Sequence, residues 1–142
     1  MDKSKERKVM GRREVADFPL LGLECVRLKI DTGAYSSAIH CSSIELVNEG
    51  LLHVVFLHED EEGFTGKAVD FNEFETRNVK SSSGHAETRY AINTRIVLGQ
   101  KKYRIRMTLT DRSEMRYPVL IGRRFLRRNR FIVDPNKTDL IN

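Results

Sequence analysis

Cysteine and long apolar runs are both scarce in this chain of 142 residues. The two cysteines, Cys25 and Cys41, are too few for a disulfide scaffold, and neither belongs to a Cys-x-x-Cys pair. No stretch approaches the roughly 20 apolar residues of a membrane span, and the polar N-terminus has no apolar core of a signal peptide. These absences predict a cytoplasmic protein with reduced thiols and no membrane partner.

Motifs for zinc and for nucleotide phosphates are also missing. The chain has no His-Glu-x-x-His pair and no Gly-x-x-x-x-Gly-Lys-[Ser/Thr] loop. His53 and His58 lie near Glu59 and Asp60, but strand parity would point the two imidazoles to opposite faces. His40 could line a site or have a structural role. We therefore expect no metal site and no cofactor.

The composition is that of one small domain with a strongly charged surface. Hydrophobic residues make up 39% of the chain and charged residues 32%, which predicts a modest core. A chain of 142 residues suits one domain and can bury enough surface without disulfides or metals. We expect residues 1–10 to form a mobile polar tail and residues 11–142 to form the single domain.

Positive charge is concentrated near both ends of the chain, within a net charge of +5, and its densest cluster lies at residues 123–130. If residues 123–128 form a helix, Arg124 and Arg128 stack at i, i+4, as do Arg123 and Arg127, and the helix has one basic face. Such a face could be a solvated surface, a phosphate-binding surface, or a recruitment surface for an acidic protein partner. Aromatic residues do not alternate with these arginines, so we do not expect a nucleic-acid partner.

Most of the chain reads as short strands separated by turn residues. Alternating apolar and polar residues, or compact apolar runs, predict strands at 26–30, 51–58, 90–98, 103–109, 117–121 and 131–133. A short helix is expected at residues 123–128, with Phe125 and Leu126 facing inward. Many short strands with one late helix favour a closed β-barrel or a sandwich.

Asp31, in the segment Ile30-Asp31-Thr32-Gly33-Ala34, is the candidate catalytic residue. A sharp turn after a strand can hold a carboxylate so that it faces a second carboxylate and a water. Gly33 allows a positive φ or a close backbone approach, the Thr32 hydroxyl can brace the turn, and Ala34 anchors the loop. Two such carboxylates cannot both ionise, so one keeps its proton while the other activates water. On its own the triplet is also consistent with a plain structural turn.

A second motif, Ile121-Gly122-Arg123, follows the apolar residues Val119 and Leu120. Apolar residues and a glycine that lead into a short helix resemble the second signature of the retropepsin-like aspartic protease clan. Together with the aspartate loop, this resemblance implies an all-β fold: a small closed barrel of retropepsin (acid protease) type with one short C-terminal helix. In that clan the strand of the second motif threads behind the aspartate loop.

The same resemblance implies a flap hairpin between the two motifs. The candidates for its tip are the small, polar residues Ser81, Ser82, Ser83 and Gly84. A plain hairpin turn with no role in substrate binding is the alternative.

A closer resemblance is to a bacterial family of RimK-associated proteins, the DUF785 type, whose members carry the name ATP-dependent zinc protease. Members often accompany glutamate-ligase-like proteins of the ATP-grasp class, which implies such a ligase as a partner. The residues of this chain fit an aspartate mechanism better than a zinc mechanism, because the zinc and nucleotide motifs are missing. The segments that carry the resemblance are 11–15, 20–22, 29–34, 36–40, 79–84 and 117–126.

One Asp-Thr-Gly segment per chain means that a catalytic pair needs a second copy of the chain, so we expect a homodimer with Asp31 of each subunit at the two-fold axis. Viral retropepsins usually have an aspartate where this chain has Tyr35, and it pairs with the arginine at the position of Arg123. That ion pair is therefore lost or replaced here. The first hypothesis is hydrolysis of peptide bonds in a peptide or protein substrate. The second is a non-catalytic binding module that acts with an ATP-grasp ligase or an acidic protein.

Overall fold

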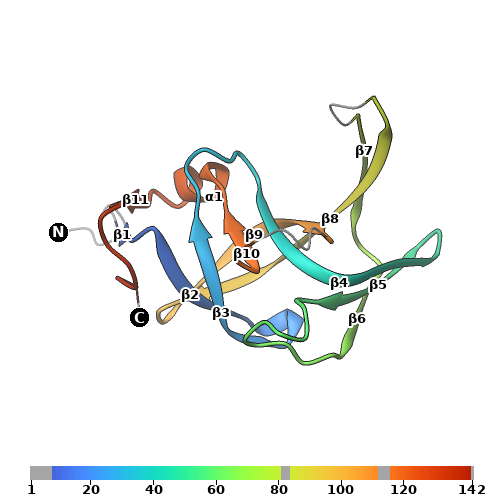
Figure 1. Ribbon diagram of the computed structural model, residues 1–142, viewed down its shortest axis with the longest axis horizontal. Coiled ribbons are helices and arrows are strands. Elements are labelled where there is room, and N and C mark those ends of the chain that lie inside the picture. The colour runs from blue at the N-terminus through green and yellow to red at the C-terminus, as the bar shows by residue number, and fades with distance from the viewer. Residues whose placement is uncertain (1–7, 81–83, 112–115, 142) are drawn as a thin grey trace.

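The computed structural model describes residues 8–80, 84–111 and 116–141. Within these ranges the chain is mostly strand, with one short α-helix and one 3-10 turn (Figure 1). The α-helix, α1, spans Arg123–Arg128, and the 3-10 turn, η2, spans Pro19–Leu21. The strands are β1 (Val9–Met10), β2 (Arg13–Phe18), β3 (Leu23–Ile30), β4 (Ser37–Asn48), β5 (Leu51–Phe56), β6 (Ala68–Phe71), β7 (Glu75–Lys80), β8 (Ala86–Leu98), β9 (Lys101–Thr110), β10 (Val119–Ile121) and β11 (Ile132–Val133).

Six strands close into a barrel in the order β10-β3-β2-β8-β9-β4, and pairing of β10 with β4 completes the circle. The short strand β10 runs parallel to β3, with Ile121 beside Ile30, and antiparallel to β4, with Val119 beside Ile39. Strands β5 and β6 extend the sheet beyond β4, and β7 pairs with the outer half of β8. The expected all-β barrel of retropepsin type, with its short C-terminal helix, is confirmed.

The alternation of residue types explains why these segments form barrel strands. In β9 the apolar side chains of Tyr103, Ile105, Met107 and Leu109 are buried, and the residues between them face outward. Strand β3 begins earlier than its predicted start at residue 26. The reason is Cys25, whose φ of 54° interrupts the alternation near an irregularity in the β2–β3 register.

Helix α1 is held on the barrel by aromatic packing. Phe125 and Leu126 are buried, as the sequence predicts. The ring of Phe125 lies 5.9 Å from that of Tyr103 on β9 and 5.8 Å from that of Phe131, which follows the helix. Aromatic pairs at such distances add to the stabilisation from buried area, so the helix fixes the end of β10 against the barrel wall. Among the described residues no helix is long and apolar enough to cross a membrane.

The N-terminal boundary of the domain lies earlier than expected. Val9 and Met10 form β1, which pairs in parallel with β11, and the Met10 side chain is fully buried. The predicted tail over residues 1–10 therefore does not extend to Met10, and residues 1–7 lie outside the described residues. The sequence gives no local signal for β1 because a strand of two residues shows no periodicity.

A buried carboxylate joins the beginning of the domain to its last described residues. Glu14 is 1% exposed, and its carboxylate accepts hydrogen bonds from the backbone N–H groups of Gly11 (2.7 Å), Leu140 (3.0 Å) and Ile141 (3.0 Å). Charged acceptors form stronger hydrogen bonds than neutral ones. This carboxylate therefore stabilises the packing of residues 140 and 141 against β2.

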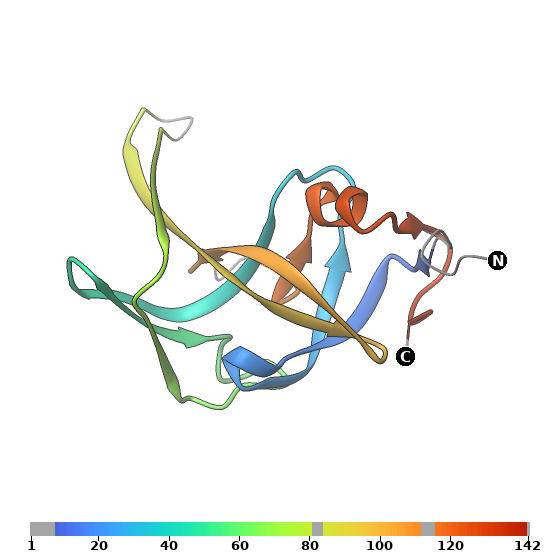
Figure 2. The same ribbon diagram turned by 180° about the vertical axis from the view of Figure 1, so that it is seen from behind.

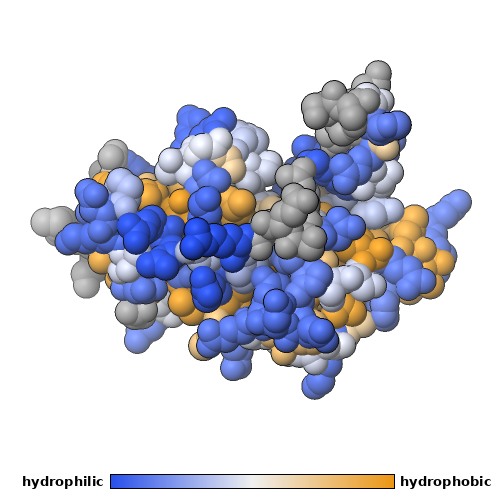
Figure 3. Space-filling view, viewed as in Figure 1, coloured by the Kyte–Doolittle hydropathy of each residue, from blue (hydrophilic) through white to orange (hydrophobic). Residues whose placement is uncertain are grey.

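Strand β4 is the longest element that the sequence pattern does not predict. Its first residues belong to the barrel, and its second half leaves the barrel to form a hairpin with β5. Leu46 and Val47, near the hairpin end, are 46% and 52% exposed. Figure 3 shows a hydrophobic area on this side of the molecule, within a surface that is otherwise largely hydrophilic. The second half of β4 therefore lacks the buried face that would make its alternation visible.

Candidate active site

The loop after β3 holds Asp31 against the second motif. The Asp31 backbone N–H donates to the Ile121 carbonyl at 2.8 Å, and one carboxylate oxygen of Asp31 accepts from the Gly33 N–H at 2.9 Å. The Ala34 N–H donates to the Asp31 carbonyl at 3.2 Å, which closes the turn. The Asp31 side chain is half-buried. Backbone groups therefore fix the carboxylate at the end of a barrel strand and leave it accessible.

Gly33 does not have a positive φ, so of the two expected roles the close backbone approach is the one that applies. A Cβ atom at this position would lie 3.2 Å from the carboxylate oxygen of Asp31, which is tighter than ordinary contact. The predicted brace from the Thr32 hydroxyl is not seen. Thr32 is exposed, and the hydrogen bonds recorded for this loop within the described residues come from other groups.

Gly122 allows β10 to pass directly behind the aspartate loop. A Cβ atom here would lie 2.5 Å from the Ser36 carbonyl oxygen and 2.7 Å from that of Tyr35, distances that no side chain could adopt without moving the backbone. The Gly122 N–H also donates to the Ser37 hydroxyl at 3.0 Å. The second motif thus packs against the loop as the resemblance implies, and glycine is needed for this contact.

Arg123 makes two other contacts in place of the ion pair that is usual in viral retropepsins. Its guanidinium donates to the Gly33 carbonyl at 3.1 Å, and its Cζ atom lies 5.5 Å from the centroid of the Tyr35 ring. Cations are attracted to the faces of aromatic rings at this range. The Tyr35–Arg123 pair therefore ties the aspartate loop to the start of α1 without a second carboxylate.

The candidate flap is the hairpin of β7 and β8. Strand β7 and the half of β8 that pairs with it extend away from the barrel in Figures 1 and 2, on the side where the aspartate loop lies. Gly84 is exposed with a φ of 85°. The other tip candidates, Ser81, Ser82 and Ser83, lie outside the described residues. A role for this hairpin in covering a substrate stays a prediction.

A groove of about 820 Å³ begins at the aspartate loop. Tyr35, Ser36 and Ser37 form one wall, and the rest is formed by α1, the strands β7, β8 and β9, and Leu20 of η2. Asp31 does not line the groove. Figure 2 shows β8 and β9 in front, with α1 at one side and the β7–β8 hairpin at the other. We call this groove the arginine groove because six arginines line it: Arg77, Arg95, Arg104, Arg106, Arg124 and Arg128.

This arginine groove was only partly predictable. The sequence indicates a basic face on α1, and Arg124 and Arg128 of that face line the groove. The alternation in β9 places Arg104 and Arg106 on the outer face of the barrel. Nothing local predicts that the strands β7, β8 and β9 and the helix α1, which is distant from them in sequence, bring the six arginines together.

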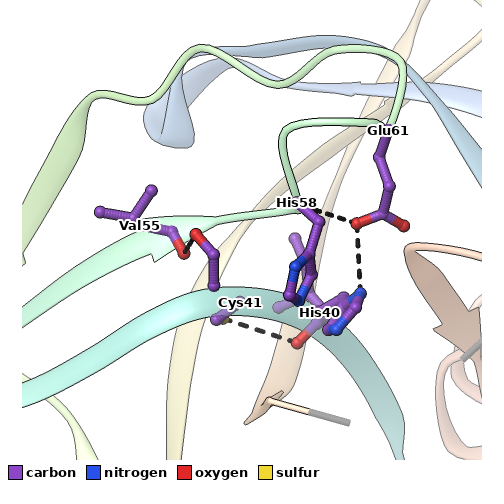
Figure 4. Close-up of polar contacts among 7 residues, drawn as sticks. His40, Cys41, Val55, His58 and Glu61 are labelled. Atoms are coloured by element: carbon purple, nitrogen blue, oxygen red, sulfur yellow. Dashed lines mark hydrogen bonds and ion pairs between the residues drawn. The ribbon is translucent and has the colours of Figure 1, made fainter. Parts of the chain in front are cut away.

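A second polar cluster lies where β4 leaves the barrel (Figure 4). The His40 imidazole is 3% exposed, and its Nδ1 atom lies 3.1 Å from a carboxylate oxygen of Glu61, which also accepts from the His58 N–H at 2.7 Å. The rings of His40 and His58 are 3.9 Å apart, and the Nε2 atoms of both are buried without a partner among the described residues. These contacts hold the acidic loop after β5 against β4, which favours the structural role for His40.

The histidine pair predicts a loss of stability in acid. Burial lowers the pKa of His40 from its ordinary value near 6.5, and His58 lowers it further, while Glu61 and Asp111 act in the opposite direction. The unfolded chain therefore binds this proton more readily, and the free energy of unfolding should fall as the pH drops below about 6.5. Urea denaturation at a series of pH values from neutral to acid measures this free energy of unfolding. It should fall less with pH in His40→Gln than in the wild-type protein.

Replacing the exposed His85 by glutamine is the matched control, and it should leave the pH dependence unchanged. Equal slopes in wild type and His40→Gln would contradict this role of the histidine pair.

The remaining histidine on β5 is separate from this cluster. His53 Nδ1 lies 2.5 Å from the Asp70 carboxylate on the neighbouring strand β6. His53 and His58 thus have different partners, but strand parity is not the reason, because β5 ends at Phe56 and His58 lies beyond it. Within the described ranges, no group of three or more histidine, cysteine, aspartate or glutamate side chains is placed to hold a metal ion. Burial raises the pKa of the Cys41 thiol, which keeps it protonated.

A half-buried aspartate at the end of a barrel strand, backed by a glycine strand that leads into a short helix, defines a retropepsin-like protein. Comparison with protein families agrees with this class. A family model described as "Retropepsin-like aspartic endopeptidase RimB" matches residues 9–142, so the chain belongs to the RimB-like family.

Curated relatives are longer proteins with another named activity. The chain is 35% identical over 138 residues to a "Probable alpha-L-glutamate ligase" of Shewanella pealeana, and the match covers 92% of this chain and 29% of that protein. A protein of the same name from Desulfotalea psychrophila is 33% identical over 134 residues, covering 91% and 28%. The chain therefore spans less than a third of the length of these relatives.

A solved structure supports the fold. The crystal structure of a Legionella pneumophila protein described as of unknown function (DUF785) superposes with a TM-score of 0.62 at 23% identity, covering 95% of this chain and 98% of that one. At this identity the likeness bears on the fold alone.

Proposed function

We propose that this protein is an aspartic endopeptidase in which Asp31 from each of two subunits activates a water for attack on a peptide carbonyl. The observation that carries the proposal is the aspartate loop: a half-buried carboxylate held by the Gly33 N–H and backed by Ile121 and Gly122. One carboxylate of the pair keeps a proton and the other acts as the general base.

A second copy of the chain would supply the partner carboxylate. Each chain has a single Asp-Thr-Gly segment, and the loop that carries it is exposed at Thr32 and Gly33, next to the carboxylate. An obligate interface of this kind buries on the order of 2,000 Å² or more. The proposed active form is therefore a symmetric dimer.

The arginine groove supports an acidic peptide as the substrate class. Arginine pairs with carboxylates through two parallel hydrogen bonds, and the groove starts at Tyr35 and Ser36, within the loop that follows Asp31. A peptide whose reacting bond lies at Asp31 could therefore place acidic side chains along the groove. The name glutamate ligase carried by curated relatives makes glutamate a reasonable candidate for these acidic residues.

The alternative is a binding module without catalysis. The same groove could hold an acidic protein, and the domain could act with an ATP-grasp ligase, because its curated relatives are ligases in which it corresponds to less than a third of the chain. A fold alone does not settle between the two functions.

Digestion of a peptide library at pH values from acid to neutral tests the first function. We expect wild-type protein to cleave acidic peptides in preference to matched peptides in which glutamine replaces glutamate. Sedimentation under the same conditions should show a dimer. A dimer that cleaves no peptide at any pH would favour the binding module, and a protein that stays monomeric at high concentration would contradict the shared catalytic pair.

A further inference from the structure

One carboxylate lies within the arginine groove. Of the groove-lining residues, six are arginines and only Glu75, on β7, is acidic. The Glu75 carboxylate forms an ion pair with the Arg106 guanidinium on β9. No ion pair is recorded for the other five arginines within the described ranges. The protein's own Glu75 carboxylate therefore occupies part of a surface whose arginines are suited to bind carboxylates of a ligand.

Strand register explains how Glu75 reaches this position. On β8 its neighbour is Ala91, and the neighbour of Ala91 on β9 is Thr108. Arg106 lies two residues before Thr108, so its side chain projects to the same face of the sheet as those of Thr108 and Glu75. Arg106 and Glu75 both line the groove. Because Ala91 has a short side chain, Glu75 can extend across β8 to the guanidinium of Arg106.

We propose that Glu75 occupies a substrate subsite, and that an acidic side chain of the substrate displaces it from Arg106. This inference rests on the proposed preference for acidic peptides. It identifies Glu75 as the residue that weakens the binding of such peptides. Glu75 acts as an internal competitor: a ligand with a carboxylate can replace its charge-assisted bonds to the arginine.

The exchange is physically reasonable because the internal pair is weak. The side chain of Glu75 is 51% exposed and that of Arg106 is 24% exposed, and ion pairs near the surface contribute little net stability. A substrate carboxylate restores the same charge-assisted hydrogen bonds to Arg106. A neutral side chain cannot, so it leaves the original pair in place.

The displaced Glu75 carboxylate still affects binding. It is carried by the first residue of β7 and stays near the groove, where it repels an acidic ligand. Its removal should therefore strengthen binding of acidic peptides and leave binding of neutral peptides nearly unchanged.

Binding of a fluorescein-labelled hexaglutamate peptide, followed by fluorescence anisotropy, tests this role. All proteins carry Asp31→Asn, so the measurement does not depend on cleavage and is separate from the test of the catalytic proposal. We expect Glu75→Gln to bind the peptide about fivefold to tenfold more tightly at low salt, and Arg106→Gln to bind it more weakly. A labelled hexaglutamine peptide should show no gain.

Glu87 on β8 provides the matched control. It belongs to the same hairpin and also pairs with an arginine, Arg89, at 3.5 Å, but it does not line the groove. Glu87→Gln should change hexaglutamate affinity by less than about twofold. Equal strengthening by both variants would show a general charge effect and overturn the proposal. Unchanged or weaker binding by Glu75→Gln, or absence of binding by every protein, would overturn it as well.

Discussion

Mixing wild-type protein with an Asp31→Asn variant in equal amounts is expected to reduce peptidase activity to about a quarter, because the proposed site takes one carboxylate from each subunit. Subunits that exchange at random form wild-type pairs in only about a quarter of the dimers. The variant alone should lose about 10²–10⁴-fold in activity, since an amide cannot act as the general base. The fold should survive, because the Asn side-chain oxygen can still accept from the Gly33 N–H.

Activity measured against the fraction of variant distinguishes the mechanisms. A shared pair gives a curve that follows the square of the wild-type fraction, whereas a linear fall to one half at equal mixing would show that each subunit acts alone. Asp139→Asn is the matched control. Asp139 is exposed with a φ of 55°, which asparagine tolerates, and mixing with this variant should leave activity constant.

Replacing Glu14 by glutamine should cause the largest loss of stability among single substitutions of similar size. The carboxylate accepts three backbone hydrogen bonds, two at one oxygen and one at the other. An amide has only one oxygen, and its NH₂ group would face a backbone N–H. A buried group left without a partner costs about 1–3 kcal/mol, so we expect a loss of about 2–4 kcal/mol in the free energy of unfolding.

Urea denaturation at neutral pH measures this loss. The control is Glu24→Gln, which makes the same substitution at an exposed glutamate. Hydrogen exchange adds a local test, because the amides of Leu140 and Ile141 should lose protection in the Glu14 variant before the barrel strands do. A change smaller than about 0.5 kcal/mol would contradict the role of this carboxylate.

Sequence patterns predicted the parts of the fold that depend on local alternation. Strand β9 is found where apolar and polar residues alternate, and helix α1 has its predicted bounds. The aspartate loop and the second motif were recognisable because each is a short run of unusual residues. Their contact, from Asp31 to Ile121, was inferred from a resemblance and is seen in the structure.

The features that escaped prediction depend on contacts between distant segments. Strand β10 closes the barrel by pairing Val119 with Ile39, about 80 residues away, and no local pattern records such a pairing. Glu14 looks like any surface glutamate in the sequence, since its partners at residues 140 and 141 are backbone groups. The alternation of inward and outward side chains along a strand is therefore easier to predict than the neighbours that the strand will have.

The Glu14 carboxylate also has a consequence for how this domain can be attached to others. It holds residues 140 and 141 beside β2, and β1 pairs with β11, so both ends of the described chain lie together, far from the β7–β8 hairpin (Figures 1 and 2). A second domain could be linked at either end without crossing the aspartate loop or the groove. A domain joined at either end would therefore leave the arginine groove open.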